Sequence, residues 1–136
     1  MKKTKIEKHL VAVYGSLLKG LHNNKHFLSD TKLIGEFDSK PEYTLYDLGS
    51  FPGLVKEGYT SVRMEIYEVN TLQLKKIDSL EGFTPGSSNN HYDRIEINTP
   101  FGKAYTYIYA QKTNNLTPVI NGDWKEFMKQ KSLINV

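Results

Sequence analysis

Leu10-Val11-Ala12-Val13-Tyr14-Gly15-Ser16-Leu17 joins a short apolar run to a glycine turn. Residues 10–13 have strand composition and polar neighbours, which predicts a strand that stops here and turns sharply. We place the turn at Gly15, because glycine tolerates backbone angles that other residues resist. Such a turn can point several backbone N–H groups into one cavity, an arrangement that suits an anion or a carboxyl group.

A helix over residues 71–81 is expected to supply the catalytic partner of this turn. Asn70 or Thr71 can cap the helix, and Gly82 is placed to end it in a left-handed conformation. The apolar residues at helical spacing are Leu74, Ile77 and Leu80. At about 100° per residue, Glu81 falls within their arc, so its carboxylate is predicted to face inward in the last turn.

The position of Glu81 should raise the pKa of its carboxyl group. Partial burial disfavours the charged form, and the negative end of the helix dipole disfavours it too. The pKa then moves toward the range that is useful for a general base or acid. The alternative is that Glu81 reaches the surface or pairs with a cation such as Arg94.

Length and charge indicate one ordinary globular domain. The chain has 136 residues, of which 38% are hydrophobic and 24% charged, and its net charge is +3. Much of the positive excess comes from Lys2, Lys3, Lys5 and Lys8. We therefore expect residues 1–8 to form a basic tail, residues 9–136 to form the domain, and no nucleic-acid partner.

The absence of cysteine excludes disulfides, thiolate zinc sites and a cysteine nucleophile. No apolar segment approaches the ~20 residues needed to cross a bilayer. The N-terminus also lacks the apolar core of a signal peptide. A cytoplasmic protein without membrane contact is the expectation.

Three motifs near the first turn suggest other chemistry and are incomplete. Residues 15–20 match the opening of a P-loop, but Leu21-His22 stands where Lys-Ser/Thr must hold phosphate and magnesium. His22 and His26 have the spacing of metal ligands on a helix, yet no third ligand has recognisable spacing, so no metal site is expected. Ser16 lacks the second glycine of a G-x-S-x-G nucleophile elbow.

The rest of the chain has mainly strand patterns. Further strands are expected at 32–37, 43–48, 54–55, 61–69, 91–97 and 103–110, with the last two forming a hairpin. Tyr105, Tyr107 and Tyr109 share one strand face, so they either line a pocket or form an exposed ladder. Residues 82–90 are predicted to be a flexible loop that can close over a ligand, and Asp123 to cap a C-terminal helix.

Seven motifs follow one another in order between Leu10 and Phe127: Tyr14-Gly15-Ser16-Leu17 with Asn23-Asn24 downstream, Phe51-Pro52-Gly53-Leu54, the strand 62–69, Asp78-x-Leu80-Glu81-Gly82, Tyr92-x-Arg94, Ala104-Tyr105-x-Tyr107 and Gly122-Asp123-Trp124. As an ordered set they resemble the γ-glutamylcyclotransferase-like superfamily, most closely its γ-glutamylamine cyclotransferase and AIG2-like branch. The sequence departs from the family pattern at Met64, where glycine is common.

The resemblance implies an α+β fold: a single domain with a small, twisted, mixed β-sheet or barrel and a few short helices. It also implies a cofactor-free cyclisation that releases 5-oxoproline from a γ-glutamyl compound. In such families the turn corresponding to Tyr14-Gly15-Ser16-Leu17 holds the γ-glutamyl group through main-chain N–H groups. Glu81 corresponds to the proton acceptor, and Tyr92 and Tyr107 are expected to be pocket residues.

Two alternatives use the same pocket. In the first alternative, the chain is a non-catalytic module that binds a small ligand or a protein. In the second, it is a γ-glutamyl acyltransferase whose acceptor is a second molecule. The leaving amine also stays open, because glutathione, γ-glutamyl amino acids and γ-glutamyl-ε-lysine share the half that the turn would hold.

Overall fold

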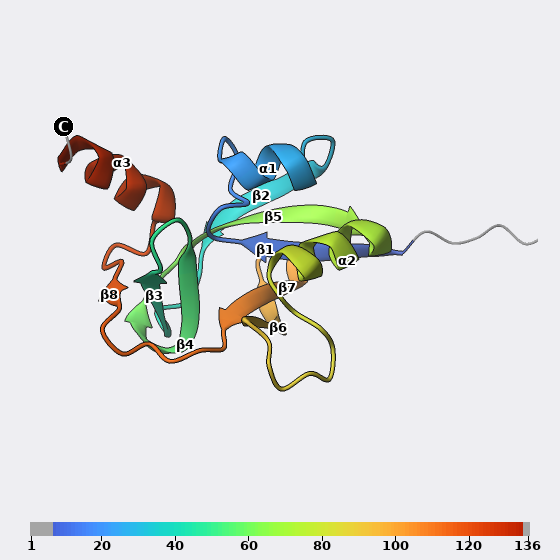
Figure 1. Ribbon diagram of the computed structural model, residues 1–136. Helices are drawn as coiled ribbons and strands as arrows, with labels where there is room; N and C mark the ends of the chain where they lie inside the picture. The colour runs from blue at the N-terminus through green and yellow to red at the C-terminus, as the bar shows by residue number, and fades with distance from the viewer. Residues whose placement is uncertain (1–6, 135–136) are drawn as a thin grey trace, which may run out of the picture.

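The computed structural model describes residues 7–134, which form two β-sheets and three helices (Figure 1). The strands are β1 (Lys8–Val13), β2 (Lys32–Asp38), β3 (Tyr43–Asp47), β4 (Pro52–Thr60), β5 (Arg63–Asn70), β6 (Tyr92–Thr99), β7 (Gly102–Tyr109) and β8 (Thr117–Pro118). The helices are α1 (His22–Phe27), α2 (Thr71–Leu80) and α3 (Trp124–Ile134). Within the described chain, no helix combines the length and hydrophobicity that a bilayer crossing requires. Of the predicted basic tail, residues 1–6 lie outside the described residues, and Lys8 already belongs to β1.

β1 lies in the middle of a five-stranded sheet whose order is β2-β5-β1-β7-β6. It runs antiparallel to β5 and parallel to β7, so the sheet is mixed. Val11, Ala12 and Val13 are at most 4% exposed, although successive side chains point to opposite faces. A strand that is covered on both faces needs consecutive apolar residues, which explains the uninterrupted run at the start of the chain.

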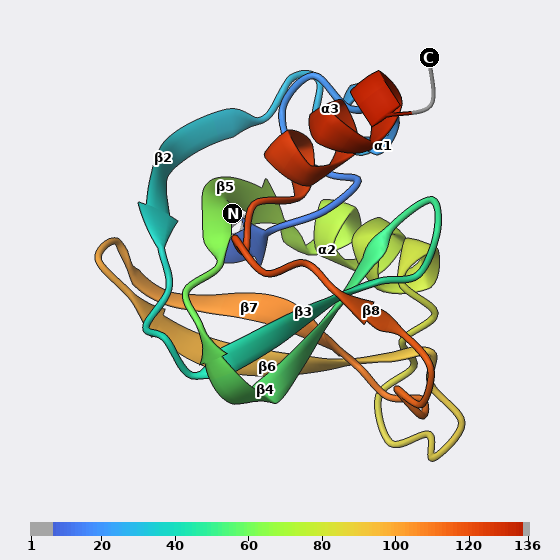
Figure 2. The ribbon, with the colours of Figure 1, turned by 90° about the vertical axis from the view of Figure 1, so that its left-hand side faces the viewer.

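The smaller sheet has the strand order β4-β3-β8. Its strand β4 contacts β7, and Figure 2 shows it beside the β6–β7 hairpin of the larger sheet. The predicted strands 32–37 and 43–48 both form, but they belong to different sheets, since β2 pairs with β5 and β3 pairs with β4. The two-residue strand β8 was not predicted. The predicted α+β fold with a mixed sheet and short helices is confirmed.

Helix α2 begins where the sequence predicts and ends at Leu80, so that Glu81 is its C-terminal cap and not part of its last turn. The Asn70 side chain accepts a hydrogen bond from the Gln73 backbone N–H (2.8 Å), and the Gln73 side chain accepts one from the Asn70 N–H (3.0 Å). These reciprocal bonds satisfy two backbone donors at the helix start. Gly82 has a φ of +66°, the left-handed conformation expected after a helix C-terminus. The helix packs on β1 and β5, and Leu80 and Glu81 at its C-terminal end line one cavity together with the turn that follows β1.

Helix α3 lies at the end of the molecule where the smaller sheet is found (Figure 1). Asp123 caps it as predicted, because its carboxylate accepts a hydrogen bond from the Glu126 backbone N–H (3.1 Å). Near the other end of the helix, Lys131 Nζ lies 2.8 Å from Asp47 Oδ2 on β3. The first residue of the helix, Trp124, is 1% exposed and belongs to the hydrophobic core.

Candidate functional site

A cavity of about 190 Å³ lies where β1 ends in the Gly15 turn and α2 ends at Glu81. All seven residues predicted from the sequence line it: Tyr14, Gly15, Ser16, Leu17, Glu81, Tyr92 and Tyr107. Residues separated by more than ninety positions therefore surround one small space. This grouping gives the predicted binding turn and the predicted acid a common site.

Three consecutive residues of the turn that line the cavity have backbone N–H groups without a partner among the described residues. Within residues 7–134, no hydrogen bond of the protein uses the backbone N–H of Gly15, Ser16 or Leu17. The Gly15 carbonyl closes the turn by accepting a hydrogen bond from the Leu18 N–H (2.9 Å). Because buried backbone N–H groups are nearly always paired, three cavity-lining ones without a partner are suited to a negatively charged group.

The reason for glycine at position 15 differs from the predicted one. Gly15 is not among the residues with positive φ, so its backbone angles do not require glycine. A Cβ atom at this position would lie 2.6 Å from Pro52 Cδ, which is closer than any real contact. The requirement is therefore the close approach of β4, a tertiary contact that local sequence does not reveal.

Glu81 follows the last turn of α2 and faces the cavity. Its backbone N–H donates to the Ile77 carbonyl (3.0 Å), which fixes the start of the side chain. Burial, together with the negative charge of Asp78, raises the pKa of the Glu81 carboxyl group from 4.5 to about 7. In the described part of the chain, no hydrogen bond or ion pair engages this carboxylate, and the alternative pairing with Arg94 does not form. Glu81 is thus half-buried, unpaired and able to exist in both protonation states near neutral pH.

Arg94 binds Asp78 instead, in a network that the sequence did not reveal. Arg94 Nη1 lies 2.6 Å from Asp78 Oδ2, and the Tyr107 hydroxyl donates to Asp78 Oδ1 (2.6 Å). The guanidinium also lies over the Tyr105 ring, 4.4 Å from its centroid. Asp78 and Glu81 are three residues apart, so they share a helix face, and this spacing was the signal that was available. The network pairs Asp78 with Arg94 and Tyr107 and leaves the Glu81 carboxylate without a partner among the described residues.

The three predicted tyrosines use their hydroxyl protons within the protein. Tyr14 donates to the Tyr107 carbonyl (2.6 Å), and Tyr92 donates to the Pro52 carbonyl (2.7 Å). Burial is the main cause that raises the pKa of Tyr14, Tyr92 and Tyr107 above the ordinary value of 10.0. These phenols therefore stay neutral and shape the cavity, while the backbone amides of the turn and the Ser16 hydroxyl, which accepts from the Asn23 side chain, have protons left to donate.

The three tyrosines of β7 do not line one pocket. Tyr107 alone of the three lines the cavity, whereas Tyr105 supports Arg94. The Tyr109 ring packs edge-on against Tyr92, with centroids 5.6 Å apart. Neither of the two arrangements considered for this strand face, a shared pocket or an exposed ladder, is formed, because the three rings have different neighbours.

The exposed side of the cavity is aromatic. Phe51 and His91 both line the cavity and are both exposed to solvent, and their ring centroids lie 6.1 Å apart. In the described chain, no lysine or arginine lines this cavity. The predicted loop 82–90 contributes no lining residue, and buried Asn90 ties it down through the backbone N–H and carbonyl of Thr84. Closure of residues 82–90 over a ligand therefore stays a prediction.

The two histidines with metal-ligand spacing lie on α1, with ring centroids 4.7 Å apart, and both are exposed. Across the described residues, no third His, Cys, Asp or Glu completes a group that could hold a metal ion with His22 and His26.

Residues 11–126 match the sequence model of the family described as "Gamma-glutamyl cyclotransferase, AIG2-like". The chain belongs to this family. A Vibrio cholerae protein named "Putative gamma-glutamylcyclotransferase" is 47% identical over 117 residues, covering 85% of this chain and 95% of that protein. The "Gamma-L-glutamyl-butirosin B gamma-glutamyl cyclotransferase" of Niallia circulans is 34% identical, covering 87% of this chain and 76% of that protein. The crystal structure of the uncharacterized protein PH0828 from Pyrococcus horikoshii has a TM-score of 0.75 at 28% identity, covering 92% of this chain and 97% of that one.

Proposed function

We propose that this γ-glutamylcyclotransferase family member converts the γ-glutamyl group of a small γ-glutamyl amine or peptide to 5-oxoproline and releases the free amine. The observation that carries the proposal is the placement of an unpaired carboxylate, with a pKa near neutrality, in the same cavity as three unpaired backbone amides. One element binds an acidic group and the other moves a proton, which are the two requirements of an intramolecular aminolysis.

The turn binds the substrate through its α-carboxylate. The backbone N–H groups of Gly15, Ser16 and Leu17 are fixed donors that need no reorganisation when an anion arrives. Those of the three donors that the α-carboxylate does not use are available to the oxyanion that forms on the γ-carbonyl, because the nearby phenols already donate elsewhere. The small volume of the cavity favours a folded glutamyl group whose α-amine lies over its own γ-carbonyl.

Glu81 moves the proton. In its ionised form it accepts a proton from the substrate's α-amine, and the amine nitrogen attacks the γ-carbonyl carbon. A new C–N bond closes the five-membered ring, the old C–N bond to the leaving amine breaks, and the leaving nitrogen takes up the proton from Glu81. With a pKa of about 7, Glu81 serves as base and then as acid near neutral pH. Such proton transfer contributes about 10²–10⁴-fold to the rate.

The aromatic side of the cavity determines which leaving amines can bind, because no lysine or arginine is among its described lining residues. A leaving group with a carboxylate close to the reacting bond would find no lysine or arginine partner among the described lining residues. A neutral or cationic amine can lie against the Phe51 and His91 rings, since aromatic faces attract cations. The Niallia circulans relative is named for a γ-L-glutamyl-butirosin, which supports including γ-glutamyl amines among the substrates.

The test is a panel of γ-glutamyl compounds, including glutathione, γ-glutamyl amino acids and γ-glutamyl-ε-lysine, analysed by mass spectrometry for 5-oxoproline. We expect 5-oxoproline from at least one compound, with amines preferred over glutathione. Stoichiometric binding without product would indicate a binding module. A linear γ-glutamyl product formed with a second amine would indicate an acyltransferase.

A further inference from the structure

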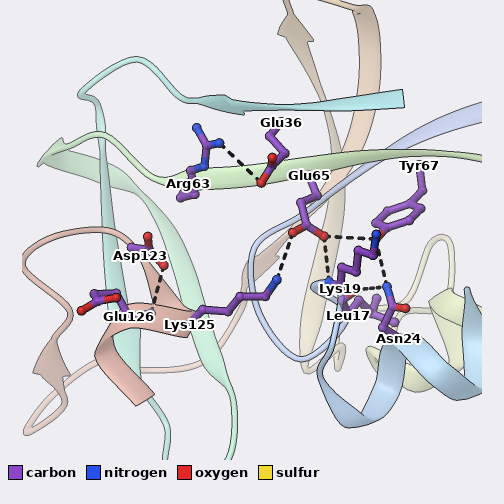
Figure 3. A network of polar contacts seen from close by, with 10 residues as sticks. All are labelled: Leu17, Lys19, Asn24, Glu36, Arg63, Glu65, Tyr67, Asp123, Lys125 and Glu126. Atoms are coloured by element: carbon purple, nitrogen blue, oxygen red, sulfur yellow. Dashed lines mark hydrogen bonds and ion pairs between the residues drawn. The ribbon is translucent and has the colours of Figure 1, made fainter. Parts of the chain in front are cut away.

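A buried glutamate outside the cavity holds the segment that follows the binding turn. Glu65 on β5 has a side chain that is 5% exposed, and its Oε1 accepts a hydrogen bond from the Lys19 backbone N–H (2.8 Å). The Tyr67 hydroxyl also donates to Oε1 (3.1 Å), and Lys125 Nζ on α3 lies 3.3 Å from Oε2. Figure 3 shows these contacts converging on Glu65 from Lys19, from Lys125 of α3 and from Tyr67 on the same strand.

The same network reaches the turn itself. The Asn24 side-chain amide of α1 donates to the Leu17 carbonyl (2.8 Å) and to the Tyr67 hydroxyl (3.0 Å). Glu65 is therefore connected to Leu17 through Tyr67 and Asn24, and to Lys19 directly (Figure 3). Both ends of the segment 17–19 are held, and this segment begins with one of the three free amides of the cavity.

Burying this carboxylate has a cost. A buried charge must recover its lost hydration from partners, and replacing a buried ion pair with packed apolar residues is often neutral or stabilising. General stability therefore does not explain a glutamate at this place. Backbone donors at a binding site need positions accurate to about 0.5 Å, which requires support from outside the site. Glu65 gives such support through directional bonds that an apolar residue cannot make.

We infer that Glu65 is a positioning residue for the γ-glutamyl-binding turn, acting through the Lys19 amide and through the Tyr67–Asn24 connection. Lys125 neutralises its charge and joins α3 to the network. The inference rests on the proposed function for its kinetic consequence, whereas its structural consequence is independent of any reaction.

The experiment compares Glu65→Leu with Glu65→Gln by hydrogen–deuterium exchange and by kinetics. Glutamine keeps an oxygen that can accept from the Lys19 N–H, so it should retain most of the protection and affinity. Leucine removes the acceptor, and each lost hydrogen bond is worth about a five- to ten-fold change in equilibrium. In Glu65→Leu we expect at least ten-fold faster exchange in a peptide covering residues 14–21. With a γ-glutamyl substrate we expect KM to rise about ten-fold while kcat changes less than three-fold.

Glu36→Leu is the matched control. Glu36 and Glu65 both line a second cavity, separate from that of Glu81, and Glu36 is half exposed and pairs with Arg63. In the described chain Glu36 makes no hydrogen bond or ion pair with residues 14–21. Exchange in residues 14–21 and KM should stay at wild-type values in this variant. If Glu65→Leu does not fold, Tyr67→Phe removes only the connection through the hydroxyl, and exchange in the same peptide should increase about five-fold.

The readouts separate the two proposals. The positioning role is overturned if exchange in residues 14–21 is unchanged in folded Glu65→Leu, or in Tyr67→Phe where it takes the place of that variant. It is also overturned if Glu65→Gln and Glu65→Leu lose exchange protection and affinity to the same extent. If the wild-type protein forms no 5-oxoproline from any γ-glutamyl compound, the proposed function fails, and the exchange measurements still decide the role of Glu65.

Discussion

Glu81→Gln should stabilise the folded protein above neutral pH. The folded-state pKa of Glu81 is about 7 and the ordinary value is 4.5, so the folded state keeps a proton that the unfolded state has already released. Below pH 4.5 the carboxyl group is protonated in both states, so it does not lower the free energy of unfolding. Between 4.5 and about 7 the wild-type protein loses stability as pH rises, and above 7 the loss is constant. Glutamine does not ionise and avoids this loss.

The magnitude follows from the difference of about 2.5 between the two pKa values, at 1.36 kcal/mol for each pH unit. The upper value is about 3 kcal/mol, and solvent screening reduces it because the Glu81 residue is partly exposed. Urea unfolding of the wild type and of Glu81→Gln at pH 4, 6 and 8 measures the difference directly. We expect no difference at pH 4 and the largest gain of the variant at pH 8.

The control is Glu57→Gln, an exposed glutamate of β4, for which the difference from wild type should not vary with pH. The reasoning would be refuted if Glu81→Gln and the wild type were equally stable at all three pH values. It would also be refuted if the variant gained the most stability at pH 4.

Two further predictions concern the neighbours of Glu81 and of the turn. Asp78→Asn should move the acidic limb of the pH profile of kcat/KM about one pH unit lower. Asp78 is the second cause of the raised Glu81 pKa and so supplies at most half of the rise. A steady-state pH profile checks this, and an unmoved limb would contradict it. Gly15→Val should raise KM more than ten-fold, because a Cβ atom at position 15 would lie 2.6 Å from Pro52 Cδ and would displace the turn. Unchanged KM and kcat would show that the turn does not bind substrate.

The local features of the fold were predictable because they depend on neighbours in the sequence. The apolar run of β1 and the caps of α2 are each determined by a few neighbouring residues. The helical spacing of α2 also gave the inward direction of Glu81. The resemblance to a family added Tyr92 and Tyr107, which no local pattern would have joined to the Gly15 turn.

The remaining features depend on contacts between distant segments. The pairing of Asp78 with Arg94 requires knowing that β6 packs beside α2, and the need for Gly15 requires knowing that Pro52 approaches it. Strand periodicity gives the face of a residue but not the strand that covers it. The same limit hid Glu65, which looks like one more polar residue on an alternating strand until its partners are known.

Release of 5-oxoproline by Glu81→Gln tests the central claim most directly. Glutamine keeps the shape of glutamate but cannot accept the proton of the attacking amine. With the best γ-glutamyl substrate of the panel, and with folding verified by thermal unfolding, we predict a kcat reduced by at least about 10²-fold. A folded variant whose kcat lies within a few-fold of wild type would contradict the account.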